Sequence, residues 1–213
     1  MSELSPRIFT EPTATYRISR AATKLYLKLR HGRRIEGAAN VPPSGGALIV
    51  ANHQSFLDIP LIASATSRHV AFVARRSLAD TPWLAFVMRE CGAVLIERGA
   101  ADRAAMREMV DHLEQGDLVS IFPEGTRSTD GRVSPFMGGA LLAARKAGVP
   151  IVPAAIRGSH AIWPRERSKP GPGRIAIRFL PAIEAGARDA LERAQAGIEA
   201  AVGAGGYADV PAI

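Results

Sequence analysis

Short apolar runs alternate with helical segments over most of the chain, and this alternation limits the possible folds more than any single motif does. Runs with the length and composition of buried strands occupy residues 47–51, 70–74, 93–96, 118–122, 151–156 and 174–179. Helical segments are predicted at residues 82–89, 101–115, 138–147 and 183–202. Because apolar strands separated by helices form largely parallel sheets with both faces covered, the pattern predicts an α/β fold with a mostly parallel or mixed central sheet.

The length of the chain suits one such domain. With 213 residues, of which 47% are hydrophobic, it can bury one substantial core. We expect the domain to span residues 35–202, after an N-terminal segment at 1–34 and before a frayed tail at 203–213. Within the fifth strand, Pro150 and Pro153 favour an edge position or a bulge, because proline cannot donate to a sheet ladder.

The positive charge of the chain is concentrated ahead of the predicted domain. The sequence has 27 basic and 20 acidic residues, which gives a net charge of +7. Seven basic residues between Thr10 and Glu36 account for the whole excess, since without them the counts balance at 20 and 20. They are Arg17, Arg20, Lys24, Lys28, Arg30, Arg33 and Arg34.

Residues 15–30 of this segment have the periodicity of an amphipathic helix. Four of the basic side chains lie opposite an apolar stripe, which consists of Ile18, Ala22, Leu25 and Leu29. Two interpretations fit this pattern: residues 15–34 lie on an anionic membrane surface, or the stripe packs on the domain and the charges face water. Nucleic acid is not an expected partner, because no nucleic-acid-binding module is visible and no aromatic residues are interleaved with the basic ones.

The sequence also carries signals about cellular location. No apolar run approaches the ~18 residues of a membrane span, and residues 1–11 lack the hydrophobic region of a signal peptide. The single Cys91 excludes an intrachain disulfide and fits a reducing compartment. We therefore expect a protein without a span or a signal peptide, bound peripherally at the cytoplasmic side of a membrane.

A histidine–aspartate pair follows the first predicted strand. His53 and Asp58 lie between that strand and a helical segment, at the carboxyl end where open α/β sheets carry their chemistry. A histidine there can take a proton from a hydroxyl, and the aspartate can orient it. The spacing alone is not specific, because His112 and Asp117 repeat it within a predicted helix end. Without further context the pair fits either a catalytic role or a histidine satisfied by a nearby carboxylate.

Basic side chains follow the other predicted strands. Arg75 ends the second strand, Arg98 follows the third, and residues 124–128 follow the fourth. If the strands are parallel, these guanidinium groups converge near His53 and favour an anionic, phosphorylated ligand. In the fourth group, Gly125 would let the backbone approach a ligand, and the Thr126 hydroxyl can donate to a phosphate oxygen. The alternative is surface salt bridging to Glu90, Glu97 and Asp102.

Four sequence blocks together resemble the glycerolipid acyltransferase family. They occupy residues 52–58 (NHQSFLD), 92–98 (GAVLIER), 122–128 (FPEGTRS) and 149–155 (VPIVPAA), in the family's order. The resemblance implies that His53 is the general base and Asp58 its orienting partner. It also implies that the acceptor is bound by Arg98, Glu124, Gly125 and Arg127, with Arg75 as a further phosphate ligand.

The resemblance further implies a reaction and its substrates. His53 would activate the free hydroxyl of a lysophospholipid with a phosphate headgroup, foremost 1-acyl-sn-glycerol 3-phosphate, to give phosphatidic acid. The donor would be an acyl thioester, either acyl-CoA or acyl-acyl carrier protein, and neither a metal nor another cofactor is expected. Acylation of another lysolipid, such as lyso-ornithine lipid, is an alternative, and thioester hydrolysis is a second one. Met137 departs from the family, which commonly has a basic residue in that block.

Overall fold

The computed structural model describes residues 13–80, 85, 88, 93–96 and 103–203 of the chain. In this part, seven strands form one sheet in the order β1-β7-β6-β2-β5-β3-β4. All neighbouring strands are parallel except β6 and β7, which are antiparallel. The predicted α/β fold with a mostly parallel or mixed sheet is therefore confirmed. The strands are β1 (Arg34–Glu36), β2 (Ala47–Ala51), β3 (Val70–Arg75), β4 (Val94–Ile96), β5 (Leu118–Ile121), β6 (Ile151–Arg157) and β7 (Ala176–Phe179).

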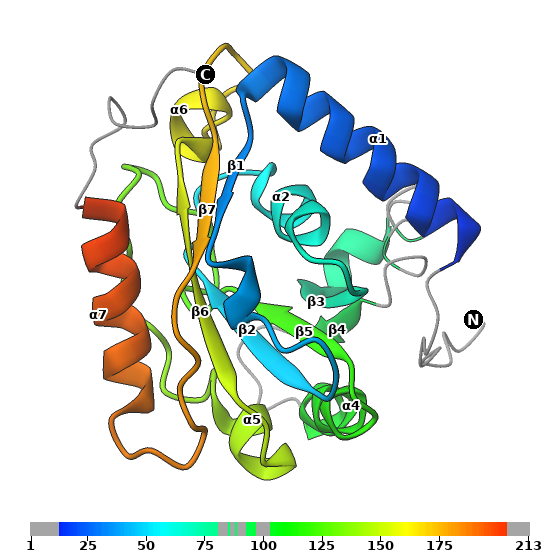
Figure 1. Cartoon of the computed structure of the whole chain (residues 1–213), viewed down its shortest axis with the longest axis vertical. Coiled ribbons are helices and arrows are strands. Elements are labelled where there is room, and N and C mark those ends of the chain that lie inside the picture. Colours follow the sequence, from blue (N-terminus) through cyan, green and yellow to red (C-terminus); the bar gives the residue numbers. More distant parts are fainter. Residues whose placement is uncertain (1–12, 81–84, 86–87, 89–92, 97–102, 204–213) are drawn as a thin grey trace.

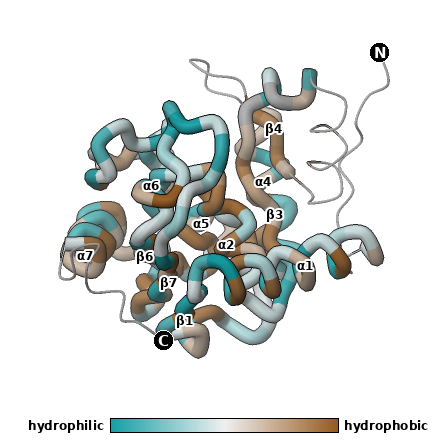
Figure 2. The backbone as a smooth tube through the Cα atoms, turned by 90° about the horizontal axis from the view of Figure 1, so that it is seen from above, coloured by the Kyte–Doolittle hydropathy of each residue, from teal (hydrophilic) through white to brown (hydrophobic). Residues whose placement is uncertain are grey.

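Helices cover both faces of the sheet (Figure 1). One apolar core lies between the sheet and the pair α1 (Ala14–His31) and α2 (Asp58–Ala65). A second core lies on the opposite face, under α4 (Arg103–Glu114), α5 (Leu142–Ala147) and α7 (Ala190–Gly203). The short elements are η1 (Ala38–Asn40), η2 (Arg76–Asp80) and α6 (Ser159–Ile162). Hydrophobic residues accordingly gather in the strands between the helices (Figure 2).

Strand β2 is the centre of the sheet and explains the apolar run at residues 47–51. All five of its residues are buried, because β6 and β5 flank it and helices cover both of its faces. Successive side chains point to opposite faces of a strand. Leu48 and Val50 therefore enter the core under α7, whereas Ile49 enters the core under α2.

The prolines of β6 do not place it at an edge. The strand lies between β2 and β7, so the edge prediction is wrong. The alternative prediction, a bulge, fits the pairing between β6 and the segment that contains β7 and Ile183. Ala154 pairs with Phe179 and Ile151 with Ile183, so two residues of β6 face three on the partner segment. Pro153 lies in this irregular stretch, and its carbonyl accepts the Leu180 N–H at 2.8 Å.

Two predicted helices begin later in the structure than the sequence suggested. The predicted helix at 183–202 begins only at Ala190, because Ile183 pairs with Ile151 beside the sheet. The helix predicted at 138–147 begins at Leu142. The helix predicted at 82–89, apart from residues 85 and 88, and the tail at 203–213, apart from Gly203 at the end of α7, lie outside the described residues. Of the N-terminal segment at 1–34, the last residue already belongs to β1.

Helix α1 packs on the domain, but the face that it buries is not its apolar stripe. It begins after Thr13, whose hydroxyl accepts the Tyr16 N–H at 3.1 Å, and ends at Gly32 with a φ of 51°. Its buried residues are Tyr16, Leu27 and His31. The stripe faces outward, since Ile18 is 70% exposed, Leu25 57% and Leu29 76%. The interpretation in which this stripe packs on the domain is therefore wrong. In the described part of the chain, no helix has the length and hydrophobicity needed to cross a membrane.

Candidate active site

The candidate site begins where β2 ends, at the carboxyl edge of the parallel strands. The side chain of Asn52 continues the ladder toward β6 at this point. Its Oδ1 accepts the Ile156 N–H at 2.7 Å, and its Nδ2 donates to the Ile156 carbonyl at 3.0 Å. Because Asn52 is fully buried, these bonds fix the position at which the backbone leaves the sheet and delivers His53.

His53 and Asp58 form the pair that their spacing suggested. Nδ1 of His53 lies 2.9 Å from Oδ2 of Asp58, which is the first residue of α2 and is completely buried. The same oxygen accepts the backbone N–H groups of Gln54 and Ser55, both at 2.7 Å. Since the carboxylate accepts, Nδ1 of His53 donates, and Nε2 carries the lone pair that could take a proton.

Phe122 holds the other side of the His53 ring. The two ring centroids are 3.9 Å apart and the planes are 17° from parallel. The His53 side chain nevertheless keeps 17% of its surface exposed. The imidazole is therefore fixed at Nδ1 and on one face, and a part of it is still open to a substrate.

The second histidine–aspartate pair, His112 and Asp117, has almost the same internal geometry. Its Nδ1–Oδ2 distance is 2.8 Å, but the His112 side chain is only 3% exposed. The pair joins the end of α4 to the start of β5, which is the amino edge of the sheet and opposite to His53. Accessibility and position therefore separate the two pairs, and distance does not.

Glu124 braces the loop after β5 against the loop after β2. Its Oε1 accepts the His53 N–H at 2.7 Å, and its Oε2 accepts the Ser134 N–H at 2.9 Å. Burial raises the pKa of this carboxyl, and the two backbone bonds oppose that rise. Nearby, the Ser128 N–H donates to the His53 carbonyl at 2.7 Å. The two loops are thus joined directly at the backbone of the candidate base.

Gly125 and Arg127 lie in the loop after β5, which is bonded to the loop that carries His53. Gly125 has a φ of 68°, and its N–H closes a turn onto the Phe122 carbonyl at 3.0 Å. The Arg127 guanidinium carbon lies 3.7 Å from the centre of the Phe56 ring, an arrangement that favours a cation–π contact. Phe56 is 50% exposed, and its ring centroid is 5.3 Å from that of Trp163. Arg127 and Phe56 therefore connect the loop after β5 with the loop after β2, which carries His53.

The remaining predicted site residues are Arg75, Arg98 and Thr126. Arg75 is the last residue of β3, which places its backbone at the same sheet edge as His53. Arg98 lies outside the described residues. Thr126 is partly exposed in the loop after β5. A convergence of several arginines on His53 therefore stays a prediction.

Several contacts of the site were not foreseen from the sequence. The clamp by Asn52, the stacking of Phe122 and the bond from Ser134 to Glu124 received no predicted role. The role of Phe122 could have been suspected from the sequence, because this aromatic residue directly follows the strand that lies next to β2. For a metal, the described residues offer no cluster of three or more histidine, cysteine, aspartate or glutamate side chains.

Fold and site together define an α/β domain with a candidate histidine base at the carboxyl edge of its sheet. The family model described as Acyltransferase matches residues 32–157, so the chain belongs to the Acyltransferase family. Curated relatives support this membership. The chain is 33% identical to 1-acyl-sn-glycerol-3-phosphate acyltransferase alpha of Ovis aries over 164 residues, which are 75% of the chain and 57% of that relative. It is 35% identical to 1-acyl-sn-glycerol-3-phosphate acyltransferase BAT2, chloroplastic, of Brassica napus over 133 residues, which are 61% of the chain.

A solved structure has the same fold. The chain matches the crystal structure of the 1-acyl-sn-glycerophosphate (LPA) acyltransferase PlsC from Thermotoga maritima with a TM-score of 0.73 and 27% identity. The match covers 91% of this chain and 82% of that one. The curated relatives are longer, and the chain spans only 38% of the Brassica napus protein. The resemblance to the glycerolipid acyltransferases is thereby confirmed at the level of family and fold.

Proposed function

We propose that the chain is an O-acyltransferase that transfers a fatty acyl group from an acyl thioester to 1-acyl-sn-glycerol 3-phosphate, giving phosphatidic acid. The names of its relatives support this acceptor. The observation that carries the proposal is the His53–Asp58 pair, which combines a buried, hydrogen-bonded carboxylate with an imidazole that is still accessible. This is the arrangement expected of a general base that must reach a substrate hydroxyl.

The mechanism is a direct transfer between the two substrates. Nε2 of His53 removes the proton of the acceptor hydroxyl while its oxygen attacks the thioester carbonyl carbon. A carbon–oxygen bond forms and a tetrahedral oxyanion results; its collapse breaks the carbon–sulfur bond, and the thiolate leaves with the proton from the imidazolium. Asp58 stabilises the imidazolium between these steps. General-base assistance of this kind contributes about 10²–10⁴ in rate.

The acceptor headgroup is proposed to lie beside the loop after β5. Arg127 supplies a guanidinium group that the Phe56 ring orients, and the Thr126 hydroxyl can donate to a phosphate oxygen. Arg75 and Arg98 are the further candidates for phosphate binding. Glu124 acts mainly by holding the loop, because each of its oxygens already accepts a backbone N–H. The half-exposed Phe56 offers an apolar surface for an acyl chain next to these polar groups.

We also infer that α1 holds the protein at an anionic bilayer. Taking 100° per residue, Leu25 and Leu29 lie about 160° around the helix from Leu27, which packs on the domain. Lys24 and Lys28 lie between the two faces, about 60° and 100° from Leu27. An outward apolar stripe with lysines along its flank suits insertion at the level of lipid headgroups.

An acceptor panel with a labelled acyl thioester tests the proposal. We expect a product with the mass of phosphatidic acid when 1-acyl-sn-glycerol 3-phosphate is supplied, and less product with lysolipids that lack a phosphate monoester. Preferred acylation of a lysophospholipid or lyso-ornithine lipid would reassign the acceptor. Thiol release that is independent of any acceptor would instead identify a thioesterase.

A further inference from the structure

A cavity lies at the opposite edge of the sheet from His53. It has a volume of about 350 Å³ and opens between α1, the segment before β2 and the loop after α2. In the described part of the chain its lining contains four basic side chains and no acidic one: Arg20, Lys24, Arg33 and Arg68. Such an accumulation of like charge is costly unless an anion balances it.

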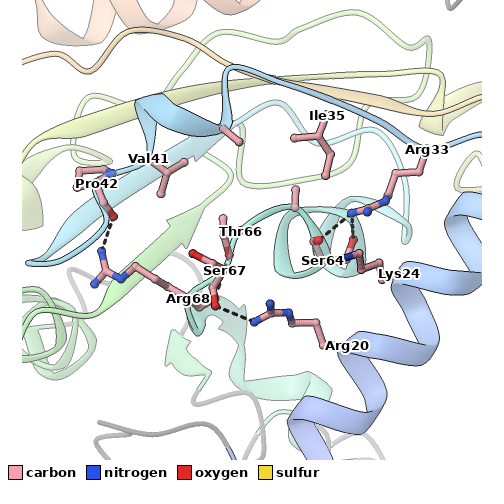
Figure 3. A pocket seen from close by; sticks show the side chains of 12 residues that line it. Arg20, Lys24, Arg33, Ile35, Val41, Pro42, Ser64, Thr66, Ser67 and Arg68 are labelled. Carbon is pink, nitrogen blue, oxygen red and sulfur yellow. Dashed lines mark hydrogen bonds between the residues drawn. The ribbon is translucent and has the colours of Figure 1, made fainter.

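Three of these side chains donate hydrogen bonds to backbone carbonyl groups (Figure 3). Arg20 donates to the Ser67 carbonyl at 3.1 Å, and Arg33 donates to the Ser64 carbonyl at 2.7 Å. Arg68 extends away from Arg20 and Arg33 toward Pro42, and it donates to the Pro42 carbonyl at 2.9 Å. The bonds from Arg20 and Arg33 satisfy carbonyl groups at and just after the end of α2, which is one reason for arginines to be there.

Hydrogen bonds to carbonyl groups do not use all the N–H donors of these four side chains. A guanidinium has five N–H donors, and the two bonds from Arg33 to Ser64 both use Nη1. The Nε of Arg33 is buried and has no hydrogen-bond partner among the described residues. Lys24 makes neither a hydrogen bond nor an ion pair to any described residue, yet it lines the cavity. Burial lowers the pKa of Arg68, and Asp117, the acid that opposes this shift, is itself bonded to His112 at 2.8 Å. Donors and positive charge therefore remain in excess.

We propose that this cavity is a second anion site, which binds a phosphate group between Lys24 of α1 and Arg33, the residue that follows the helix end. Phosphate fits because it accepts several charge-assisted hydrogen bonds at once, from a planar guanidinium and from a point charge. The phosphate can belong to a lipid headgroup, since α1 also exposes its apolar stripe, or to a soluble metabolite. The site is separate from the proposed catalytic centre and does not depend on acyl transfer.

Isothermal titration with inorganic phosphate tests the site without any acyl donor, against chloride at equal ionic strength. Lys24→Gln is the test variant, and Lys28→Gln is the matched control, because Lys28 is exposed on the next turn of α1 and does not line the cavity. We expect saturable binding that Lys24→Gln weakens about tenfold and Lys28→Gln less than twofold. Equal effects of the two substitutions, or no saturable binding by the unmodified chain, would overturn the proposal.

Two further arms locate the phosphate and identify its source. Binding that survives Arg127→Ala supports the second site, whereas binding lost there and kept in Lys24→Gln would place the phosphate in the proposed acceptor site and overturn it. Vesicles of phosphatidylglycerol in phosphatidylcholine are then compared between the two lysine variants. A greater loss in Lys24→Gln, with competition by free phosphate, upholds the site as a headgroup site. Equal vesicle binding alongside unequal phosphate binding upholds it as a site for a soluble phosphate.

Discussion

The imidazole of His53 lies against the ring of Phe122, with the centroids 3.9 Å apart and the planes 17° from parallel. Asp58 fixes the same imidazole from its edge, through the 2.9 Å contact to Nδ1. Held on one face and at one nitrogen, the ring can present Nε2 in a single direction. A general base needs this restriction, because proton transfer requires hydrogen-bond reach and alignment at the moment of attack.

Removing the Phe122 ring should therefore reduce turnover more than substrate binding. We expect Phe122→Ala to lower kcat about tenfold while the acceptor KM changes less than threefold, since the ring positions the base and is not proposed to contact the headgroup. Steady-state kinetics measure both constants. Phe122→Leu keeps an apolar surface and should recover part of the loss. A rise in acceptor KM at constant kcat would show that Phe122 acts in binding instead.

Arg127 provides a test of headgroup recognition. We expect Arg127→Ala to raise KM for a phosphorylated acceptor at least about tenfold and to leave the donor KM nearly unchanged, because charge-assisted bonds to phosphate are lost. Arg132→Ala is the control, since Arg132 lies in the same connection with a side chain that is 87% exposed. If the donor KM changes and the acceptor KM does not, Arg127 faces the thioester.

The outward stripe of α1 predicts how the protein binds vesicles. We expect the double change Leu25→Ser and Leu29→Ser to abolish the salt-resistant part of binding to anionic vesicles, since both side chains are more than half exposed. Cosedimentation over a salt series measures it. Removing the whole helix is a poorer test, because Leu27 is completely buried. Leu142→Ser, at another exposed leucine, is the control, and equal effects of the two changes would exclude insertion of the stripe.

His69 should make the stability of the fold depend on pH. Burial lowers the pKa of His69 to about 4; Asp117 opposes this shift, and His112 and Arg20 add to it. His69 is therefore protonated below about pH 6.5 in the unfolded chain, but only below about pH 4 in the folded chain. This group should remove about 3 kcal/mol of stability as the pH falls through that window.

Replacing His69 should remove that part of the pH dependence. Its ring centroid lies 4.4 Å from that of Tyr16 in α1, and His69→Phe keeps an aromatic ring at this contact. Denaturant unfolding at pH 7 and pH 4 measures the difference for both proteins. Equal losses in the variant and the unmodified chain would show that His69 does not carry the effect.

Some of this architecture was readable from the sequence, and some was not. The apolar run at residues 47–51 predicts a buried strand, and all five residues of β2 are buried. The buried face of α1 was not predictable, because Arg20 and His31 contribute to it and both look solvated in the sequence. Arg20 reaches the Ser67 carbonyl, and His31 bonds the Gly173 carbonyl at 3.1 Å, so each is satisfied by distant backbone.

The contact between His53 and Asp58 was predictable from the sequence, and the accessibility of His53 was not. The motif context distinguished His53 from His112, but both histidines form the predicted contact to an aspartate, at 2.9 and 2.8 Å. Only the folded chain shows that one side chain is open and the other is enclosed. Likewise, Glu124 was expected to bind the acceptor, yet its oxygens accept two backbone N–H groups from loops that the sequence does not bring together.

The central claim, that His53 is the general base of acyl transfer, is tested most directly by comparing His53→Ala with His112→Ala. The measurement is the rate of label transfer from an acyl thioester to 1-acyl-sn-glycerol 3-phosphate, with thermal melting recorded for each variant. We predict a loss of about 10²–10⁴ in His53→Ala with melting unchanged. His112→Ala should keep its transfer rate, although loss of a buried hydrogen bond lowers its melting temperature. Comparable loss of transfer in both variants with unchanged melting, or full activity in His53→Ala, would contradict the assignment.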